Sequence, residues 1–198
     1  DPLIAANVDL RVSVDVVKVH SLSFRKVAFA LHTRANRIEA TVADSAFGKG
    51  HGRMRLIAVA GADGMDLKLT SAIDGGDLGE VLTSLTGARR FSGTGSAQLA
   101  LETSGRSMAE FVANADGRIS ATLREGSLFG IDLRRIANRR AGKRPEIALL
   151  ESIGGETPFE TASLTTRITH GAANPVDGRM QAGRLVGSIT GVVDFAQG

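Results

Sequence analysis

The feature that most constrains this chain is a period-two alternation of apolar and polar residues that runs through most of the sequence. Between Val8 and Val16 every second residue is apolar, and the residues between them are Asp, Arg or Ser. Successive side chains of a β-strand point to opposite faces, so the pattern predicts strands with one apolar and one polar face. The phase slips at Val16–Val17, which predicts a bulge. Similar alternation predicts strands around residues 27–31, 38–42, 54–60, 65–73, 97–101, 119–123, 164–168 and 187–195.

Three short segments have the apolar spacing of helices. Asp77 is a suitable N-cap for the first, which runs to about residue 85. Ser107 and Glu110 form a capping box at the start of the second. The third is expected over residues 131–140, and the Gly and Pro breaks in residues 141–158 predict a loop or sub-boundary after it.

These elements predict a mainly β fold: a long curved antiparallel sheet with about three short helices, in one domain over residues 1–198. An alternating sheet has to cover its apolar face. The helices offer too few large apolar side chains to cover about ten strands. The residues leave two alternatives open, a sheet that folds over itself as a closed sandwich and a sheet whose apolar face stays partly open for a ligand.

Composition excludes several classes of function. With 42% hydrophobic residues the chain is globular, and the absence of cysteine excludes disulfides and cysteine-ligated metals. The net charge is only +3, and aromatic residues make up 4% with no Trp or Tyr, which argues against nucleic acid as a partner. No run of eighteen apolar residues predicts a transmembrane helix. The chain begins at Asp1 without a signal sequence, so we expect it to be a piece of a longer protein.

No group of residues has the spacing of a catalytic or metal site. The histidines at positions 20, 32, 51 and 170 form no HxH, HxxxH or HExxH pair. The glycine-rich stretch 48–52 lacks the Walker spacing, and residues 93–95 lack the third glycine of a dinucleotide loop. We therefore expect no enzymatic activity, no cofactor and no metal.

One dense cluster of positive charge lies in and after the third predicted helix. It is either a solvated helix face or a contact with anionic headgroups or a protein partner, because the planar arginine side chain suits bidentate phosphate binding. The cluster consists of Arg134, Arg135, Arg139, Arg140, Lys143 and Arg144.

The stretch from Leu85 to Leu133 resembles the C-terminal region of the AsmA family. The resemblance is carried by an ordered string: Leu85-Thr86-Gly87, Phe91-Ser92-Gly93-Thr94-Gly95, Ala97-Gln98-Leu99-Ala100-Leu101, Gly105-Arg106-Ser107-Met108, Ala115-Asp116-Gly117 and Glu125-Gly126-Ser127-Leu128-Phe129-Gly130-Ile131-Asp132-Leu133. Residues 157–171 and 185–195 are similar to the closing strands of the family, whereas residues 1–73 fit it loosely. The Arg-rich helix matches no motif of the family.

The resemblance implies a periplasmic protein tethered to the inner membrane of a Gram-negative bacterium, with an elongated β-groove. It favours the open form of the sheet and a role in phospholipid transport to the outer membrane, or alternatively in assembly or scaffolding of envelope proteins. Phospholipid or another envelope lipid is then the expected partner, and Arg134, Arg135, Arg139 and Arg140 the expected headgroup or partner contacts. The expected lipid-binding positions are the apolar strand residues Val12, Val14, Phe29, Leu31, Leu56, Leu67, Leu69, Leu99, Leu101, Ile119, Leu123, Ile168, Ile189 and Val193.

Overall fold

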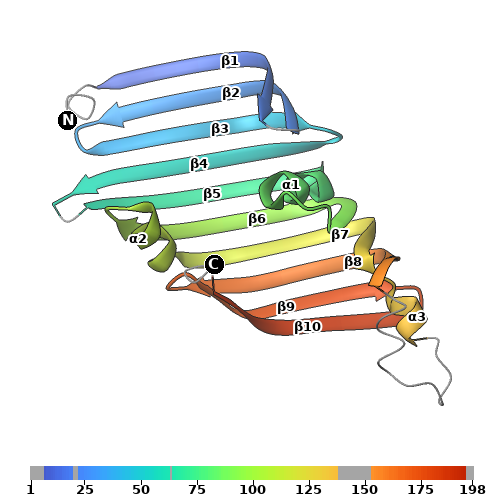
Figure 1. Cartoon of the computed structure of the whole chain (residues 1–198). Coiled ribbons are helices and arrows are strands. Elements are labelled where there is room, and N and C mark those ends of the chain that lie inside the picture. Colours follow the sequence, from blue (N-terminus) through green and yellow to red (C-terminus); the bar gives the residue numbers. More distant parts are fainter. Residues whose placement is uncertain (1–6, 20–21, 63, 138–152, 195–198) are drawn as a thin grey trace.

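The computed structural model describes residues 7–19, 22–62, 64–137 and 153–194, which form one antiparallel sheet with three short helices (Figure 1). The ten strands lie side by side in chain order. The prediction of a mainly β fold built on a long antiparallel sheet is therefore confirmed. The strands are β1 (Val8–Val19), β2 (Leu22–Arg34), β3 (Arg37–Phe47), β4 (Gly50–Gly61), β5 (Gly64–Asp77), β6 (Phe91–Gly105), β7 (Asp116–Ile131), β8 (Ile153–Thr169), β9 (Ala172–Ala182) and β10 (Leu185–Asp194).

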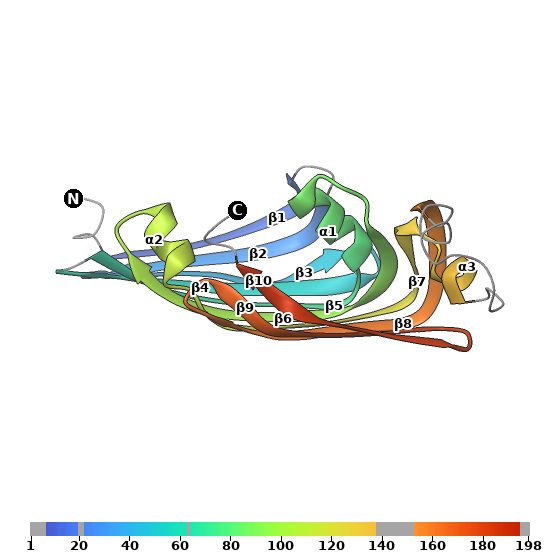
Figure 2. The ribbon, with the colours of Figure 1, turned by 60° about the horizontal axis from the view of Figure 1, so that its bottom comes forward.

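The sheet is curved and open. Figure 2 shows α1 (Leu78–Thr86) and α2 (Met108–Ala113) above the same, concave side of the sheet, near opposite ends of the strands. β1 and β10 are the two edges of the sheet and do not pair with each other. Over the described residues no second sheet covers the concave side. Of the two alternatives left open by the sequence, the structure has the half-open groove.

The strands bend along a line near the end of the sheet that carries α1. Lys26 in β2 and Glu125 in β7 have left-handed backbone conformations, with φ of 54° and 50°. Between them the strand register shifts beside Ser45 in β3, Gly76 in β5 and Thr94 in β6. Bulges and left-handed residues bend a strand and increase its twist. This bend line turns the strand ends toward the concave side (Figure 2).

The first helix is fixed by its caps and by one buried leucine. The Asp77 carboxylate accepts the backbone N–H of Glu80 at 2.9 Å, and Gly87 ends the helix with φ of 69°. Both ends agree with the sequence-based prediction. Leu78 is 3% exposed, and it packs into a small core at this end of the sheet. The other buried members of that core are Leu123, Phe159 and Ala182.

The second helix is held at the opposite end of the strands by polar contacts. The Ser107 hydroxyl accepts the N–H of Glu110 at 3.2 Å, as the capping box predicts. The Glu110 carboxylate reaches one residue further back than expected, to the N–H of Arg106 at 2.7 Å. The Thr103 hydroxyl of β6 donates to the carbonyl of Phe111 at 2.6 Å, which ties the helix to the concave face.

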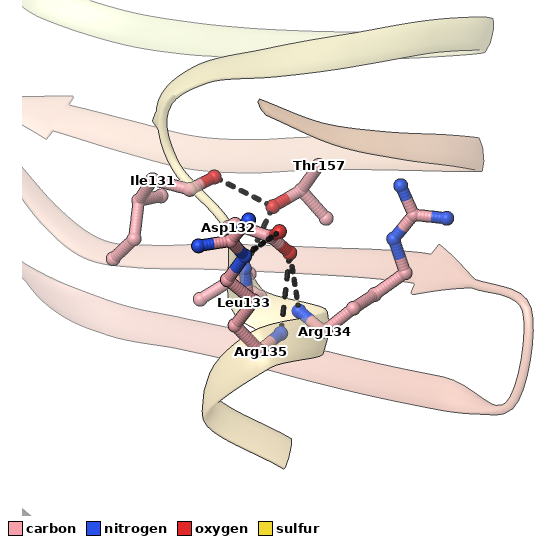
Figure 3. Close-up of polar contacts among 6 residues, drawn as sticks. All are labelled: Ile131, Asp132, Leu133, Arg134, Arg135 and Thr157. Atoms are coloured by element: carbon pink, nitrogen blue, oxygen red, sulfur yellow. Dashed lines mark hydrogen bonds and ion pairs between the residues drawn. The ribbon is translucent and has the colours of Figure 1, made fainter. Parts of the chain in front are cut away.

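The third helix, α3 (Leu133–Ala137), is joined to the sheet through a buried threonine (Figure 3). Thr157 of β8 is 0% exposed. Its hydroxyl donates to the carbonyl of Ile131 at 2.7 Å and accepts the N–H of Leu133 at 2.9 Å. One side chain thus satisfies the last carbonyl of β7 and the first N–H of the helix. The helix was predicted over residues 131–140, of which residues 138–140 lie outside the described chain.

Two segments differ from the sequence-based prediction. The predicted loop over 141–158 is too long, because β8 begins at Ile153 and its first residues pair with β7; residues 141–152 lie outside the described chain. The pairing of β8 with β7 outweighs the loop propensity of Gly154 and Pro158. Strand β9 was not predicted, since its small residues and Pro175 give no clear apolar alternation.

The predicted bulge at Val16–Val17 is not a shift of register. Strands β1 and β2 keep one register on both sides of it, with Val14 opposite Val27 and Val17 opposite Phe24. The distortion lies instead at Lys26 of β2, where the backbone is left-handed. The break in the apolar–polar alternation at Val16–Val17 lies where β1 and β2 cross the bend line.

Replacing Thr157 with Val should destabilise the fold. The change keeps the side-chain volume but leaves a buried carbonyl and a buried N–H without their partner, at about 1–3 kcal/mol each. We expect urea unfolding to show a loss of about 2 kcal/mol or more. Thr161→Val, at an exposed position of the same strand, is the matched control and should change little. Equal stability of the two variants would contradict this role of Thr157.

The single-domain assignment remains a prediction that truncation can test. A chain that ends at Ser104 lacks β7 to β10, and with them the buried Leu123, Phe159 and Ala182 that pack on Leu78. We expect it to be insoluble or molten, because of the four buried residues of that core only Leu78 remains. A cooperative thermal melt with well-dispersed amide NMR signals would show instead that residues 1–104 fold independently.

Candidate functional site

The concave face carries apolar side chains in rows that run across the whole sheet. Residues directly opposite each other on neighbouring strands share a face, so the register identifies each row. One row is Val12, Phe29, Val42, Met54, Ser71, Leu99, Ile119, Thr166, Val176 and Gly191. The next is Leu10, Leu31, Ala40, Leu56, Leu69, Leu101, Gly117, Ile168, Ala173 and Val193. Neither row contains a charged residue.

Every apolar position proposed from the sequence falls on this face. Ten of them belong to the two rows above: Val12, Phe29, Leu31, Leu56, Leu69, Leu99, Leu101, Ile119, Ile168 and Val193. Val14, Leu67, Leu123 and Ile189 lie opposite Val27, Ala58, Ala162 and Gly178 in parallel rows. Positions 189 and 193 are placed by backbone register alone. That these residues bind lipid remains a prediction.

The face includes further apolar residues that the sequence-based selection left out. Leu10, Met54 and Leu164 lie in the same rows or in the next one. The same alternation could have identified them. Their exposed fractions are 45%, 39% and 36%, which is high for large apolar side chains. Leu67, Leu69, Leu99 and Leu101 are half-buried.

The two helices limit the open part of the face along the strands. At one end Leu78 of α1 packs over a core to which Ala97 of β6 contributes. At the other end Thr103 of β6 contacts α2. Six residues separate Ala97 from Thr103, about 20 Å at 3.4 Å per residue. The exposed apolar surface between the two helices is therefore about 20 Å wide along the strands and runs across them, and we call it the trough.

The opposite, outer face is polar and charged. Glu39 lies there with ion pairs to Arg55 at 2.7 Å and Arg37 at 3.4 Å, and Lys68 pairs with Glu102. Partial burial opposes ionisation of Glu39, but the hydrogen bonds from the two arginines outweigh it and lower the pKa of the carboxyl. The sheet thus separates an apolar face from a charged one.

The basic cluster is only partly described. The Asp132 carboxylate caps α3 by accepting the N–H groups of Arg134 at 3.0 Å and Arg135 at 3.2 Å (Figure 3). The Arg135 side chain folds back onto the same carboxylate at 3.3 Å, and both Arg134 and Arg135 are exposed. Arg139 and Arg140, with Lys143 and Arg144, lie outside the described residues. The predicted headgroup contact is therefore still untested.

Each described histidine lies next to an aspartate. His32 lies 3.4 Å from Asp9, and His51 lies 3.3 Å from Asp44. His170 is in the turn between β8 and β9, where its backbone N–H donates to the carboxylate of Asp116. His20 lies outside the described residues. In the glycine-rich stretch 48–52, residues 48–49 form the turn between β3 and β4, and residues 50–52 begin β4. In the described chain no three His, Cys, Asp or Glu side chains are grouped as metal ligands, and no helix there is long and apolar enough to cross a bilayer.

Comparison with known proteins identifies the family. The model of the AsmA family matches residues 3–177, which is most of the chain. Comparisons with curated proteins and with solved structures found no match. The matched region includes β1 to β8 and the three helices between those strands, and so most of the trough and both of the helices that limit it. The chain belongs to the AsmA family.

Proposed function

We propose that this chain is a non-enzymatic lipid-binding segment of an AsmA-family protein. It holds acyl chains in the trough on its concave face and contributes to phospholipid transport between the inner and outer membranes. Its place is then the periplasm, with tethering to the inner membrane by other segments of the full-length protein. It uses no cofactor and has no nucleic-acid partner.

The observation that carries the proposal is that two mostly apolar rows, neither with a charged residue, cross all ten strands. Soluble proteins rarely leave large contiguous apolar surfaces exposed unless these bind something. Covering the exposed half of one Leu or Val side chain is worth on the order of 1 kcal/mol. Several such residues per acyl chain offset the entropy that a bound lipid loses.

The width of the trough is consistent with this ligand. The open segment of about 20 Å between α1 and α2 is comparable to an extended fatty acyl chain of a membrane phospholipid. An acyl chain needs contact area and no directed hydrogen bonds. Side chains such as Leu99 and Met54 provide that area without polar atoms.

A role in assembly or scaffolding of envelope proteins is the alternative. It is favoured by β1 and β10, whose outer edges are unpaired in the described sheet and could accept a strand of another protein. Native mass spectrometry of protein purified from cells separates the two functions. Co-purified phospholipid supports transport, and lipid-free protein in complex with an envelope protein supports scaffolding.

Replacing Leu99 or Leu101 with Asp should weaken lipid binding. Each change places a charge in the middle of the trough, where desolvation under an acyl chain costs several kcal/mol. We expect titration with a fluorescent phospholipid to show at least tenfold weaker binding, while circular dichroism still shows a β fold.

The matched control for this prediction is Thr122→Asp. Thr122 is exposed on β7 and lies on the outer face, opposite Ser96 and Ser163. The Thr122→Asp substitution introduces the same charge into the strand next to β6 and should leave lipid binding unchanged. Unchanged binding in folded Leu99→Asp and Leu101→Asp variants would rule out the trough as the lipid site.

The basic cluster in and after α3 offers a separate test of membrane contact. Reversing the charge of Arg135 and Arg139 to Glu should weaken co-sedimentation with anionic vesicles, since each cation near such a surface contributes about 1 kcal/mol. Raised salt should have the same effect, because exposed charges are screened within about 10 Å at 0.1 M. Arg11→Glu with Arg179→Glu, at exposed strand positions, is the control. Equal sedimentation of wild type and the Arg135/Arg139 variant at low salt would leave the helix as a solvated face.

A further inference from the structure

A shallow hollow of about 460 Å³ lies on the outer face over β3 to β7. We call it the outer hollow. Thr70, Ala72 and Ala100 are the small side chains at its centre, on β5 and β6. Arg53 on β4 and Arg118 on β7 lie on either side of them. Long side chains therefore flank a floor of short ones.

The outer hollow lies on a row of residues that contains arginines but no acid. The row follows the register across eight strands, and it can be compared with the row beside it, which contains four acids, one lysine and one histidine. The first row is Arg11, Ala30, Thr41, Arg55, Thr70, Ala100, Arg118 and Arg167. The second is Asp9, His32, Glu39, Ile57, Lys68, Glu102 and Asp116.

In the second row Lys68 pairs with Glu102, and Glu39 pairs with Arg37 and Arg55. Three arginines at or beside the hollow form no ion pair with a described residue. Arg118 and Arg167 lie directly opposite each other on β7 and β8. Like charges in this arrangement destabilise a sheet. Among the described residues neither arginine side chain has a hydrogen-bond or ion-pair partner, and the same is true of the Arg53 side chain. Arg55 is different, because Glu39 holds it at 2.7 Å.

We propose that the outer hollow binds the phosphate group of a ligand that carries at least two negative charges. The ligand is either a soluble phosphate ester or a lipid headgroup. The site lies on the face opposite the trough and does not depend on the function proposed for the trough.

The chemistry of the lining fits such a ligand. The hollow contains no carboxylate, and its polar groups include Arg53, Arg118, Gln98 and the hydroxyls of Thr70 and Ser120. Arginine binds phosphate oxygens through two parallel hydrogen bonds. Arg53 and Arg118 are three strands apart and offset by two residues along the strands, about 16 Å between backbones, so their long side chains can converge on one group over the floor. A ligand of this kind also removes the repulsion between Arg118 and Arg167.

Titration with inorganic pyrophosphate at constant ionic strength tests the proposal. We expect saturable binding by calorimetry, with amide NMR shifts confined to residues of the hollow. Arg53→Gln combined with Arg118→Gln should weaken binding at least tenfold. Arg11→Gln combined with Arg179→Gln is the matched control. It removes two charges from the same face, and both arginines pair with an Asp of their own strand, at 3.6 Å and 3.8 Å.

The possible results distinguish a specific phosphate-binding site from diffuse electrostatic attraction. Equal weakening by the two double variants, or equal affinity for sulfate, would overturn the proposal. So would the absence of binding to both pyrophosphate and vesicles by the wild-type chain. All variants change exposed side chains, and a thermal melt equal to that of the wild type verifies the fold.

The source of the phosphate is identified with vesicles. Phosphatidylcholine vesicles with and without phosphatidic acid are compared for the wild type and the Arg53/Arg118 variant. Loss of phosphatidic-acid binding in the variant assigns the hollow to a lipid headgroup. Binding of pyrophosphate alone assigns it to a soluble phosphate ester. Leu101→Asp, a trough variant outside the lining of the hollow, should not affect either result. Failure of this proposal is therefore distinguishable from failure of the trough.

Discussion

Cross-strand hydrogen bonding within a single layer of sheet is the interaction on which the rest of this structure depends. Most domains hold their strands by packing two layers around a core. Here the buried core is small and lies at the α1 end, around Leu78, Leu123 and Phe159. Elsewhere the ten strands are held by their ladders and by cross-strand side-chain pairs. Such a sheet can keep one face free, because its stability does not require that face to be covered.

The bend line converts this free face into a trough. Without it the apolar rows would lie on a gently twisted sheet. Left-handed residues at Lys26 and Glu125, and register shifts between them, turn the strand ends toward α1. Gly126 shows how closely the chain packs there: a Cβ on it would lie 2.0 Å from the carbonyl oxygen of Ser92. The same line also closes one side of the trough, since the core around Leu123 and Phe159 lies beside it under Leu78 of α1.

The sequence predicts the strands and their faces because alternation is a local property of each strand. Leu99 and Leu101 could be assigned to one face from their spacing alone, and the caps at Asp77 and Ser107 are equally local signals. Strand β9 could not be predicted, because its position depends on pairing with β8 and β10. The outer hollow was missed for a similar reason. Arg53 and Arg118 are 65 positions apart in the sequence, and only the register of four strands brings them to one site.

The two-faced sheet limits which insertions and deletions this chain can accept. Removing one residue from the middle of β6, such as Ala100, would exchange the faces on one side of the deletion, for example placing Glu102 in the trough and Leu101 on the outer face. At the bend line the strands already contain register shifts and left-handed residues, so one residue more or less can be absorbed there without reversing the rest of a strand. We therefore expect length variation among relatives to concentrate at the bend line and in the turns, with strand centres constant in length.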